Sequence, residues 1–348
     1  MRRHIIIGDI HGCLGELEQL LAVVGATPED VIVSVGDLVD RGPESPAVVR
    51  FFREYPNTLA IAGNHERKHI RGIFSYAQEI TRLQFGSAYD DAVAWMRTLP
   101  YALELDDAIV VHAGLIPGLP LASQQPEILC GSTSGEKELE GLMAGVYWHE
   151  RWTGPKPVVF GHHVVDEPLV RSGLVYGIDT GACHGGQLTA LTIPDFRLHS
   201  VPAREDHWAR IKRAWQADVL ASKPWAAMSW QELDEQLARF RNVDEPRSRA
   251  YVGALLVWRD RVDARFDEVL AAVQGEAARL TAEGGEHGRA ALAKSHSLST
   301  LLFQSFRGRL DRAALSRQVY GPRRLDEICI TLGLDAAPLP ALPKRASS

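Results

Sequence analysis

The sequence has few cysteines and no long hydrophobic run, and both absences argue against whole classes of protein. Only 4 of the 348 residues are cysteines, and no two of them form a C-x-x-C pair. We therefore expect no disulfide framework and a reducing compartment. No apolar stretch reaches about 18 residues, the minimum for a membrane-spanning helix, and the apolar run near the N-terminus is too short for a signal peptide. We expect a cytoplasmic protein without membrane contact.

Charge and composition divide the chain into two parts. Residues 1–202 contain 15 basic and 25 acidic side chains, whereas residues 203–348 contain 23 and 19. The first part alternates short apolar runs with amphipathic stretches, and the second is rich in Ala, Leu, Arg and Glu. At roughly 150 residues per domain, we predict one domain over residues 1–202, a helical accessory domain over 203–335 and a disordered, Pro/Ala-rich tail over 336–348.

The first part is typical of an α/β domain. Apolar runs bounded by turn residues predict strands at 5–7, 31–35, 59–62, 109–111, 158–160, 169–171, 174–178, 188–193 and 196–201. Helical spacing is found at 14–24 and 46–53. Ser172-Gly173 suits a tight hairpin turn, and we expect the last strands to form an antiparallel meander.

The second part is predicted to be mainly helical. The helical stretches are 206–220, 230–241, 248–282 and 287–310, separated by breaks at Pro224, Pro246, Gly284-Gly285 and Pro322.

Five short stretches place polar side chains directly after predicted strands. They read GDIHG (8–12), GDLVDRG (36–42), GNHE (63–66), VVHAG (110–114) and VFGHH (159–163). Such strand ends form the ligand-binding edge of open α/β sheets. Asp9 and His11 lie two residues apart and therefore point to the same side. The whole set predicts a site for two divalent metal ions with one bridging carboxylate, and its members are Asp9, His11, Asp37, Asn64, His112 and His162.

Each of these residues alone would have an ordinary structural explanation. A lone histidine at a strand end is more often structural, and a lone aspartate more often caps a turn or a helix. The prediction depends on five stretches in succession, each ending a strand. Mixed nitrogen and oxygen ligands fit manganese, iron or zinc better than calcium, and manganese is the metal that we expect.

These motifs resemble the metal-binding signature of the phosphoprotein phosphatase family, within the calcineurin-like metallophosphoesterases. The resemblance covers residues 4–201 and includes the DTG at 179–181 of the bacterial branch. It implies a β-sandwich flanked by helices. It also implies that Asp9 and His11 hold one metal, that Asp37 bridges, and that the second metal is held by Asn64, His112 and His162.

The resemblance implies roles for five further residues. His65 would protonate the leaving group as a general acid, oriented by the carboxylate of Asp40. Arg41 and Arg151 would bind phosphate oxygens. Asp179 would support a metal or its histidine ligand from outside the coordination sphere, and a structural turn is the alternative role for this residue. Two metals together would activate a water for attack on phosphorus, without a covalent phosphoenzyme.

We therefore predict hydrolysis of phosphate monoesters on a phosphoprotein or a nucleotide, as in bacterial serine/threonine protein phosphatases. A diadenosine tetraphosphate hydrolase is the first alternative. In that branch the second acid of GDLVDRG is commonly alanine and GNHE becomes GNHD, so Asp40 and Glu66 favour the phosphatase. The basic second part and Trp148–Arg151 keep an RNA-end phosphatase and nucleic-acid binding open, and a homo-oligomer also stays open. A non-enzymatic binding module would require a missing ligand, and none is missing.

Overall fold

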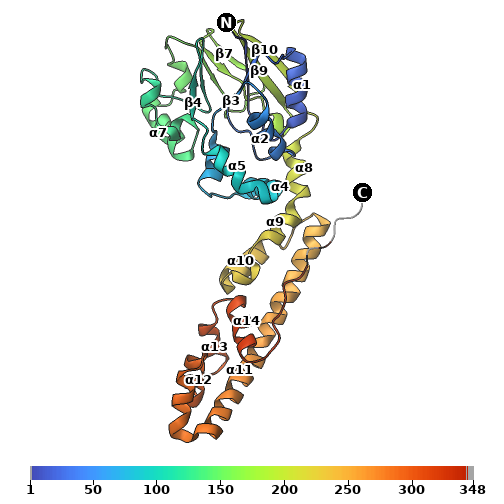
Figure 1. Cartoon of the computed structure of the whole chain (residues 1–348), viewed down its shortest axis with the longest axis vertical. Coiled ribbons are helices and arrows are strands. Elements are labelled where there is room, and N and C mark those ends of the chain that lie inside the picture. Colours follow the sequence, from blue (N-terminus) through green and yellow to red (C-terminus); the bar gives the residue numbers. More distant parts are fainter. Residues whose placement is uncertain (1, 342, 344–348) are drawn as a thin grey trace. The chain divides into compact units, whose positions relative to one another are not determined.

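The computed structural model describes residues 2–341 and 343. The chain divides into two compact units, the first ending at Trp215 and the second beginning at Gln216 (Figure 1). Each unit has a hydrophobic core of its own. None of the helices in the described part of the chain has a segment that is long and hydrophobic enough to span a membrane.

Two five-stranded mixed sheets form the centre of the first unit. The first has the order β10-β9-β1-β2-β3, with β1 at His4–Ile7, β2 at Val31–Ser34, β3 at Thr58–Ala60, β9 at Gln187–Ile193 and β10 at Arg197–Pro202. The second has the order β4-β5-β6-β8-β7, with β4 at Ala102–Glu104, β5 at Ile109–Val111, β6 at Val158–Phe160, β7 at Leu169–Arg171 and β8 at Val175–Gly177. β1, β2 and β3 run parallel, and so do β5 and β6, which aligns their carboxyl ends.

Strands β2, β5, β6 and β8 are buried over their whole length, because both faces of the sheets are covered there. Ile6 and Val33 of the first sheet share one core with Val110 and Val159 of the second. Their chain neighbours point to the opposite faces and belong to two other clusters, because side chains alternate along a strand. This arrangement confirms the predicted β-sandwich.

Helices cover the outer faces of the sandwich (Figure 1). α1 (Leu14–Val24) and α2 (Ser45–Glu54) pack on the first sheet in a cluster that includes Leu17. α7 (Thr133–Met143) packs on the second sheet through Leu139. The other helices of this unit are α3 (Asn64–Ile70), α4 (Tyr76–Phe85), α5 (Tyr89–Met96), α6 (Pro126–Leu129) and α8 (His207–Ala214).

The observed strands agree with the predicted ones to within two residues at each end, and β4 is an addition. The predicted antiparallel meander is wrong, because β7 and β8 pair in the second sheet and β9 and β10 in the first. The chain crosses between the sheets after β8, and this crossing carries Asp179. The tight turn at Ser172-Gly173 is confirmed, since both residues have positive φ (50° and 67°), as in a type I′ turn, and the backbone N–H of Leu174 donates to the carbonyl oxygen of Arg171 at 2.9 Å.

The second unit is helical, as predicted. Its longest helix, α11 (Pro246–Lys294), buries side chains at intervals of three or four residues from Val252 to Leu280, which places them on one face. Gly285 interrupts this helix with non-helical dihedral angles (φ 61°, ψ −174°), which confirms the predicted break. The other helices are α9 (Gln216–Ser222), α10 (Trp230–Arg239), α12 (Ser299–Phe306), α13 (Arg312–Gln318) and α14 (Pro322–Thr331).

Two predicted helices are each divided in the structure. The single helix predicted over 206–220 is wrong, because α8 ends at Ala214 and α9 starts at Gln216. The single helix predicted over 287–310 is also wrong, because α11 ends at Lys294 and α12 starts at Ser299. The tail predicted over 336–348 lies partly outside the described residues, which exclude 342 and 344–348. Within the described part, the carbonyl oxygen of Ala337 accepts a hydrogen bond from the Trp258 indole at 3.0 Å.

A buried polar pair, His207 and Glu16, holds α8 against α1. Nε2 of His207 lies 2.9 Å from Oε1 of Glu16 on α1, and the backbone N–H of Arg204 donates to the same oxygen at 3.1 Å. Both side chains of the pair are buried. Removing one partner of such a pair leaves a buried charge without compensation.

We expect a chain shortened after Trp215 to fold and to keep the site of the first unit, because α8 and its polar pair are retained. A chain shortened after Pro202 loses His207 and should melt roughly 5–10 °C lower, since Glu16 loses its partner. Thermal unfolding followed by circular dichroism compares the two. Equal melting temperatures would show that α8 does not stabilise the first unit.

Candidate metal centre

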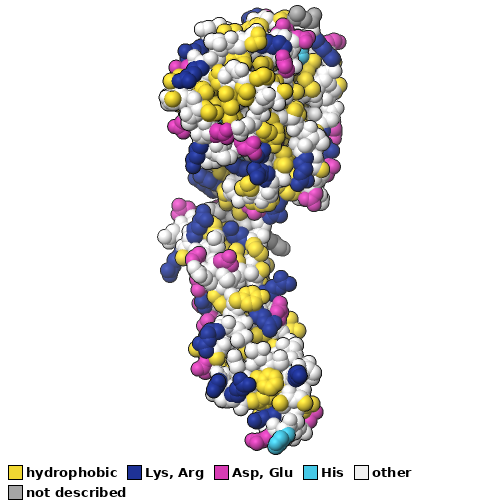
Figure 2. Space-filling view, turned by 90° about the vertical axis from the view of Figure 1, so that its left-hand side faces the viewer, with side chains coloured by type: hydrophobic (Ala, Val, Ile, Leu, Met, Phe, Trp, Pro, Cys, Tyr) yellow, Lys and Arg dark blue, Asp and Glu magenta, His cyan; other side chains and the backbone are white. Residues whose placement is uncertain are grey.

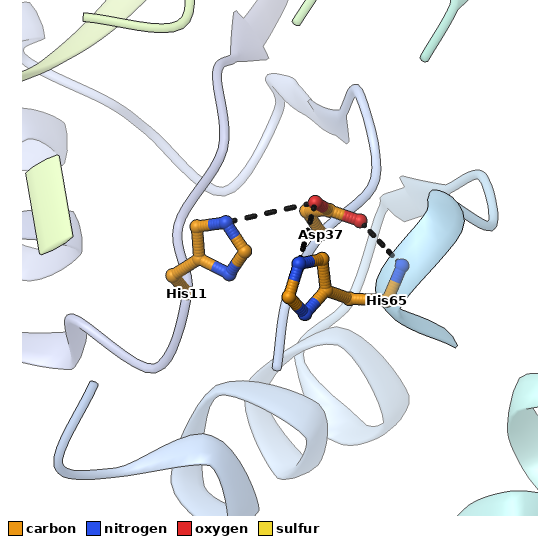
Figure 3. Close-up of side chains that lie close together, drawn as sticks. All are labelled: His11, Asp37 and His65. Atoms are coloured by element: carbon orange, nitrogen blue, oxygen red, sulfur yellow. Dashed lines mark hydrogen bonds and ion pairs between the residues drawn. The ribbon is translucent and has the colours of Figure 1, made fainter. Parts of the chain in front are cut away.

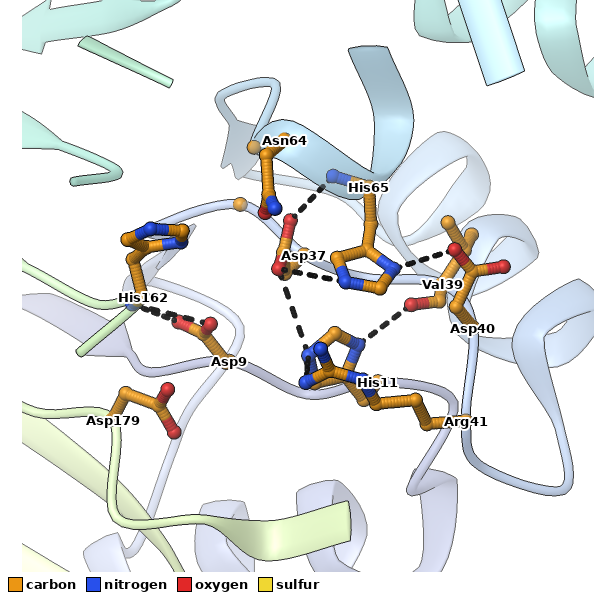
Figure 4. A network of polar contacts seen from close by, with 12 residues as sticks. Asp9, His11, Asp37, Val39, Asp40, Arg41, Asn64, His65, His162 and Asp179 are labelled. Carbon is orange, nitrogen blue, oxygen red and sulfur yellow. Dashed lines mark hydrogen bonds and ion pairs between the residues drawn. The ribbon is translucent and has the colours of Figure 1, made fainter. Parts of the chain in front are cut away.

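The candidate ligands come together where strands of both sheets end. Asp37 follows β2, and α3 starts at Asn64, directly after the loop that follows β3. His112 and His162 follow β5 and β6 of the second sheet. Figure 4 shows the side chains of Asn64, His162 and Asp9 around the carboxylate of Asp37. Residues far apart in the sequence thus form one cluster because the sheets face each other.

The loops that carry these residues have an unusual backbone. Five predicted site residues have positive φ, namely His11 (47°), Asp37 (50°), Asp40 (73°), Arg41 (66°) and His162 (66°). Residues other than glycine rarely adopt this region, which costs about 1–3 kcal/mol each, and such strain clusters at functional sites. The backbone is strained at the positions that present these side chains.

Two glycines let the backbone lie directly against the carboxylates. A Cβ atom at Gly63 would lie 2.1 Å from Oδ1 of Asp37, and one at Gly161 would lie 2.0 Å from Oδ1 of Asp9. Both distances are far below van der Waals contact, so no side chain fits at either position. This close approach explains the glycines that begin GNHE and precede His162.

Two imidazoles present their Nε2 atoms to Asp37. Nδ1 of His11 donates to the carbonyl oxygen of Val39 at 2.7 Å. Nδ1 of His112 donates to the carbonyl oxygen of Val35 at 2.9 Å. Because Nδ1 of each ring is occupied by its carbonyl partner, Nε2 is the ring atom that is available to a metal.

The spacing of these donor atoms fits bound ions. Nε2 of His11 lies 3.6 Å from Oδ2 of Asp37 (Figure 3), and Nε2 of His112 lies 3.4 Å from Oδ1. Two ligands that each bind one ion at about 2.1 Å in tetrahedral geometry are about 3.4 Å apart. The donor set thus fits one ion on each side of the Asp37 carboxylate.

The second predicted ligand set is also brought together. Donor atoms of Asp37, His112 and His162 all lie within 4.8 Å of one another. Oδ1 of Asn64 lies 3.3 Å from Nε2 of His112. His162 has a further partner, since its Nε2 lies 2.8 Å from Oε1 of Glu136.

Asp9 and Asp179 form a pair of buried carboxylates (Figure 4). Burial, together with the nearby charge of Asp179, holds the pKa of Asp9 well above its usual range. Burial also raises the pKa of Asp179. The backbone N–H of His162 donates to the Asp9 carboxylate at 3.2 Å. Two carboxylates in this position would be stabilised by a divalent cation, which agrees with a metal at this end of the cluster.

His65 is oriented by Asp40. Its Nδ1 lies 2.6 Å from Oδ2 of Asp40, and both side chains are buried. Its Nε2 is buried and has no hydrogen-bond partner among the described residues. This atom lies 3.9 Å from Oδ2 of Asp37 (Figure 3) and within 4.8 Å of a donor atom of His11. It is therefore placed to face either a substrate oxygen or a metal ion.

Sequence analysis missed two residues that hold Asp40. Nε2 of His69 lies 2.9 Å from Oδ1 of Asp40, and the amide of Gln78 donates to Oδ2. Although burial would raise the pKa of Asp40, the contacts with His65 and His69 hold it well below the usual range. Asp40 is therefore a fixed anion. His69 follows His65 by four residues on α3, and this helical spacing was the signal that could have identified it.

The two predicted phosphate-binding arginines differ in position. Nη1 of Arg41 lies 3.0 Å from Nε2 of His11, so Arg41 reaches the cluster (Figure 4). The guanidinium and a metal would compete for the same lone pair of His11. Arg151 is exposed, and no hydrogen bond or ion pair of its side chain to the described residues was found. The structure therefore does not bring Arg151 into the cluster.

Glu66 is a third residue whose role no sequence motif indicated. Its buried carboxylate accepts hydrogen bonds from the backbone N–H groups of Asp37 (2.9 Å), Leu38 (2.8 Å), Val39 (3.3 Å) and Gly63 (2.9 Å). Burial and the charge of Asp37 raise the pKa of Glu66 to about 7. Glu66 thereby joins the loop after β2 to the start of α3 and holds Asp37 in place.

We expect Glu66→Gln to lower the free energy of unfolding by roughly 2–4 kcal/mol, because an amide nitrogen replaces one acceptor oxygen and faces N–H donors. Urea denaturation measures the change. Glu54→Gln is the matched control, since Glu54 is exposed at the end of α2 and should change stability by less than about 0.5 kcal/mol. Equal effects of the two substitutions would contradict the role of Glu66.

Comparisons with known proteins agree with this geometry. Residues 3–180 match the family model of the calcineurin-like phosphoesterases. The asymmetrical bis(5′-nucleosyl)-tetraphosphatase PrpE of Bacillus cereus (strain AH820) is 29% identical over 238 residues, which cover 58% of this chain and 94% of that protein. PrpE of Anoxybacillus flavithermus is 30% identical over 236 residues, covering 57% and 93%. A solved structure described as a putative diadenosine tetraphosphatase is 30% identical, covers 58% and 93%, and has a TM-score of 0.49.

The match over residues 3–180 spans about half of the chain and contains every candidate metal ligand. The buried cluster of histidine and aspartate side chains lies within the same stretch. The chain therefore belongs to the calcineurin-like phosphoesterase family, as the sequence motifs predicted, and is a metal-dependent phosphoesterase.

Proposed function

We propose that this chain hydrolyses dinucleoside polyphosphates asymmetrically. The observation that carries the proposal is the similarity to two proteins named asymmetrical bis(5′-nucleosyl)-tetraphosphatases, over 93–94% of their own length. This similarity supports the first alternative of the sequence analysis better than its main prediction, a serine/threonine phosphatase. Asp40 and Glu66, which favoured the phosphatase, thus carry less weight than similarity over 93–94% of the length of these relatives.

The candidate cluster would hold two divalent ions. Asp9, His11 and Asp37 are the proposed ligands of one ion, and Asp37 would be shared with the second ion, held by Asn64, His112 and His162. Manganese is our first choice, and iron or zinc also suits these donors. Divalent ions bound here would supply Lewis acidity to the phosphate and lower the pKa of a water molecule.

The chain's own residues would contribute charge and a proton. The Arg41 guanidinium carries two parallel donors that suit phosphate oxygens, and it lies next to His11. His65 would donate a proton from Nε2 to the leaving oxygen, because that atom is buried and has no partner among the described residues. Asp40 would keep the His65 ring in position and stabilise its charged form.

One observation favours hydrolysis of phosphate monoesters as a second function. The alkoxide that leaves from a phosphoserine is a strong base and needs a proton, whereas a leaving phosphate has a second pKa of only about 6. The buried Asp40–His65 pair, with its 2.6 Å contact, is a proton-donating arrangement suited to the first case. Hydrolysis of phosphate monoesters should therefore depend more strongly on proton donation by His65 than hydrolysis of dinucleoside polyphosphates does.

The products of diadenosine tetraphosphate distinguish the proposals. With added manganese we expect AMP and ATP, and no pair of ADP molecules, when the products are separated by chromatography. A metal chelator should abolish the reaction and manganese should restore it, because the reaction would require the ions that the proposed ligands bind. A phosphopeptide, nitrophenyl phosphate and RNA ends with a 3′-phosphate complete the panel. Rapid hydrolysis of the phosphopeptide with an inert dinucleotide would overturn the proposal in favour of the second function.

We expect His65→Ala to retain its metal content, measured by elemental analysis, while turnover falls. The loss should be about 10²–10⁴-fold for phosphoserine, the usual scale for a lost general acid, and smaller for diadenosine tetraphosphate. Asp40→Asn should give a milder form of this pattern. His287→Ala, at an exposed position of the second unit, is the control and should change neither quantity. An empty metal site, or equal losses on all substrates, would place His65 among the ligands.

A further inference from the structure

A cavity of about 510 Å³ lies directly beside the candidate metal centre. Its lining includes Ala113 and His163, which are the chain neighbours of the proposed ligands His112 and His162. Glu136 on α7 also lines it, and the carboxylate of Glu136 lies 2.8 Å from Nε2 of His162. A substrate whose phosphate lies at the metal centre could therefore extend into this cavity.

The walls of the cavity are largely hydrophobic and aromatic. α7 contributes Leu139 and Met143, and the segment that follows contributes Tyr147 and Trp148. Trp148 is buried, and its indole N–H donates to the carbonyl oxygen of Ala113 at 3.2 Å. This hydrogen bond connects the aromatic wall of the cavity to Ala113, the residue that follows the proposed ligand His112.

Tyr147 differs from the other aromatic residue of the wall because it is 65% exposed. Its ring stacks on His149 with 5.4 Å between the ring centroids and 10° between the planes. An exposed, oriented ring at the edge of a cavity is a platform on which a planar ligand can stack. Figure 2 shows the side of the chain on which α7 lies in Figure 1, and hydrophobic side chains gather in the upper part of that view.

The charged side chains that line the cavity disfavour the binding of a phosphate group inside it. Two carboxylates, Glu136 and Glu140, line it together with a single cation, Lys137. Carboxylates repel a polyphosphate, but they accept hydrogen bonds from ribose hydroxyls and from the amino group of a base. The lining thus suits the uncharged nucleoside end of a nucleotide better than its phosphates.

We propose that this cavity binds the nucleoside of the substrate, with the base on Tyr147 and a hydroxyl or amino group donating to Glu140. The volume lies within the range of small-molecule sites, about 300–1,000 Å³. The proposal rests on the proposed function, since it assigns a place to one nucleoside of the dinucleotide. A hydrophobic side chain of a phosphopeptide would offer Glu140 no hydrogen-bond donor, so a nucleoside fits the lining better.

The test compares two inhibitors of nitrophenyl phosphate hydrolysis by the full chain with manganese. AMP and ribose 5-phosphate carry the same phosphate and sugar, and only AMP carries a base. We expect the inhibition constant of AMP to be ~10-fold lower than that of ribose 5-phosphate, the usual size of one base–aromatic stack. In Tyr147→Ala this ratio should fall toward one, and Tyr147→Phe should restore it.

Leu142→Ala is the matched control, because Leu142 is 51% exposed on α7 but does not line the cavity, and it should leave the ratio unchanged. Equal inhibition by AMP and ribose 5-phosphate in the unmodified chain would overturn the nucleoside site. The nucleoside site would also be overturned if Tyr147→Ala and Leu142→Ala lowered the ratio of the two inhibition constants equally. It would be overturned as well if Tyr147→Ala impaired only the hydrolysis of phosphopeptides. The readout does not require hydrolysis of a dinucleotide. If diadenosine tetraphosphate is not hydrolysed but AMP still inhibits more strongly than ribose 5-phosphate, the proposed function is rejected and the cavity proposal stands. If diadenosine tetraphosphate is hydrolysed but AMP and ribose 5-phosphate inhibit equally, the cavity proposal is rejected and the proposed function stands.

Discussion

The buried carboxylate of Asp37 is the group around which the site is built. Imidazoles of His11 and His112 approach its two oxygens from different sides, and the backbone N–H of His65 donates to Oδ1 at 3.0 Å. Burial opposes a charge at this position, yet the surrounding imidazoles hold the pKa of Asp37 well below its usual range. One anion therefore connects loops from both sheets, and its position decides where the ions would lie.

The elements around Asp37 keep it in place at a cost in stability. Strained backbone at five site residues would relax unless the neighbouring structure prevented it. Glu66 opposes that relaxation, because its carboxylate binds four backbone N–H groups in two loops. A second buried anion, Asp40, is held by His65, His69 and Gln78. The resulting network fixes the positions of the Asp37 and Asp40 carboxylates.

The distribution of charge around the site matches the distribution of charge in the proposed substrate. Positive and metal-binding groups, including Arg41, lie where strands end, and carboxylates with hydrophobic walls lie in the cavity next to His163. A dinucleotide has the matching division, with charged phosphates next to a planar, uncharged nucleoside. The helical second unit lies outside the matched residues 3–180, and we assign it an accessory role as a proposal.

The sequence by itself determined the family, the sandwich and the set of candidate ligands. Each ligand follows an apolar strand within a short motif, and such local patterns are readable because strand ends and glycines are encoded in adjacent residues. Only the tertiary structure decided which side chains support them. Glu66 and Gln78 act on residues more than 25 positions away, Arg151 stays outside the cluster, and the last four strands separate into two sheets. These features depend on contacts between distant segments, which no local pattern specifies until the sheets have packed.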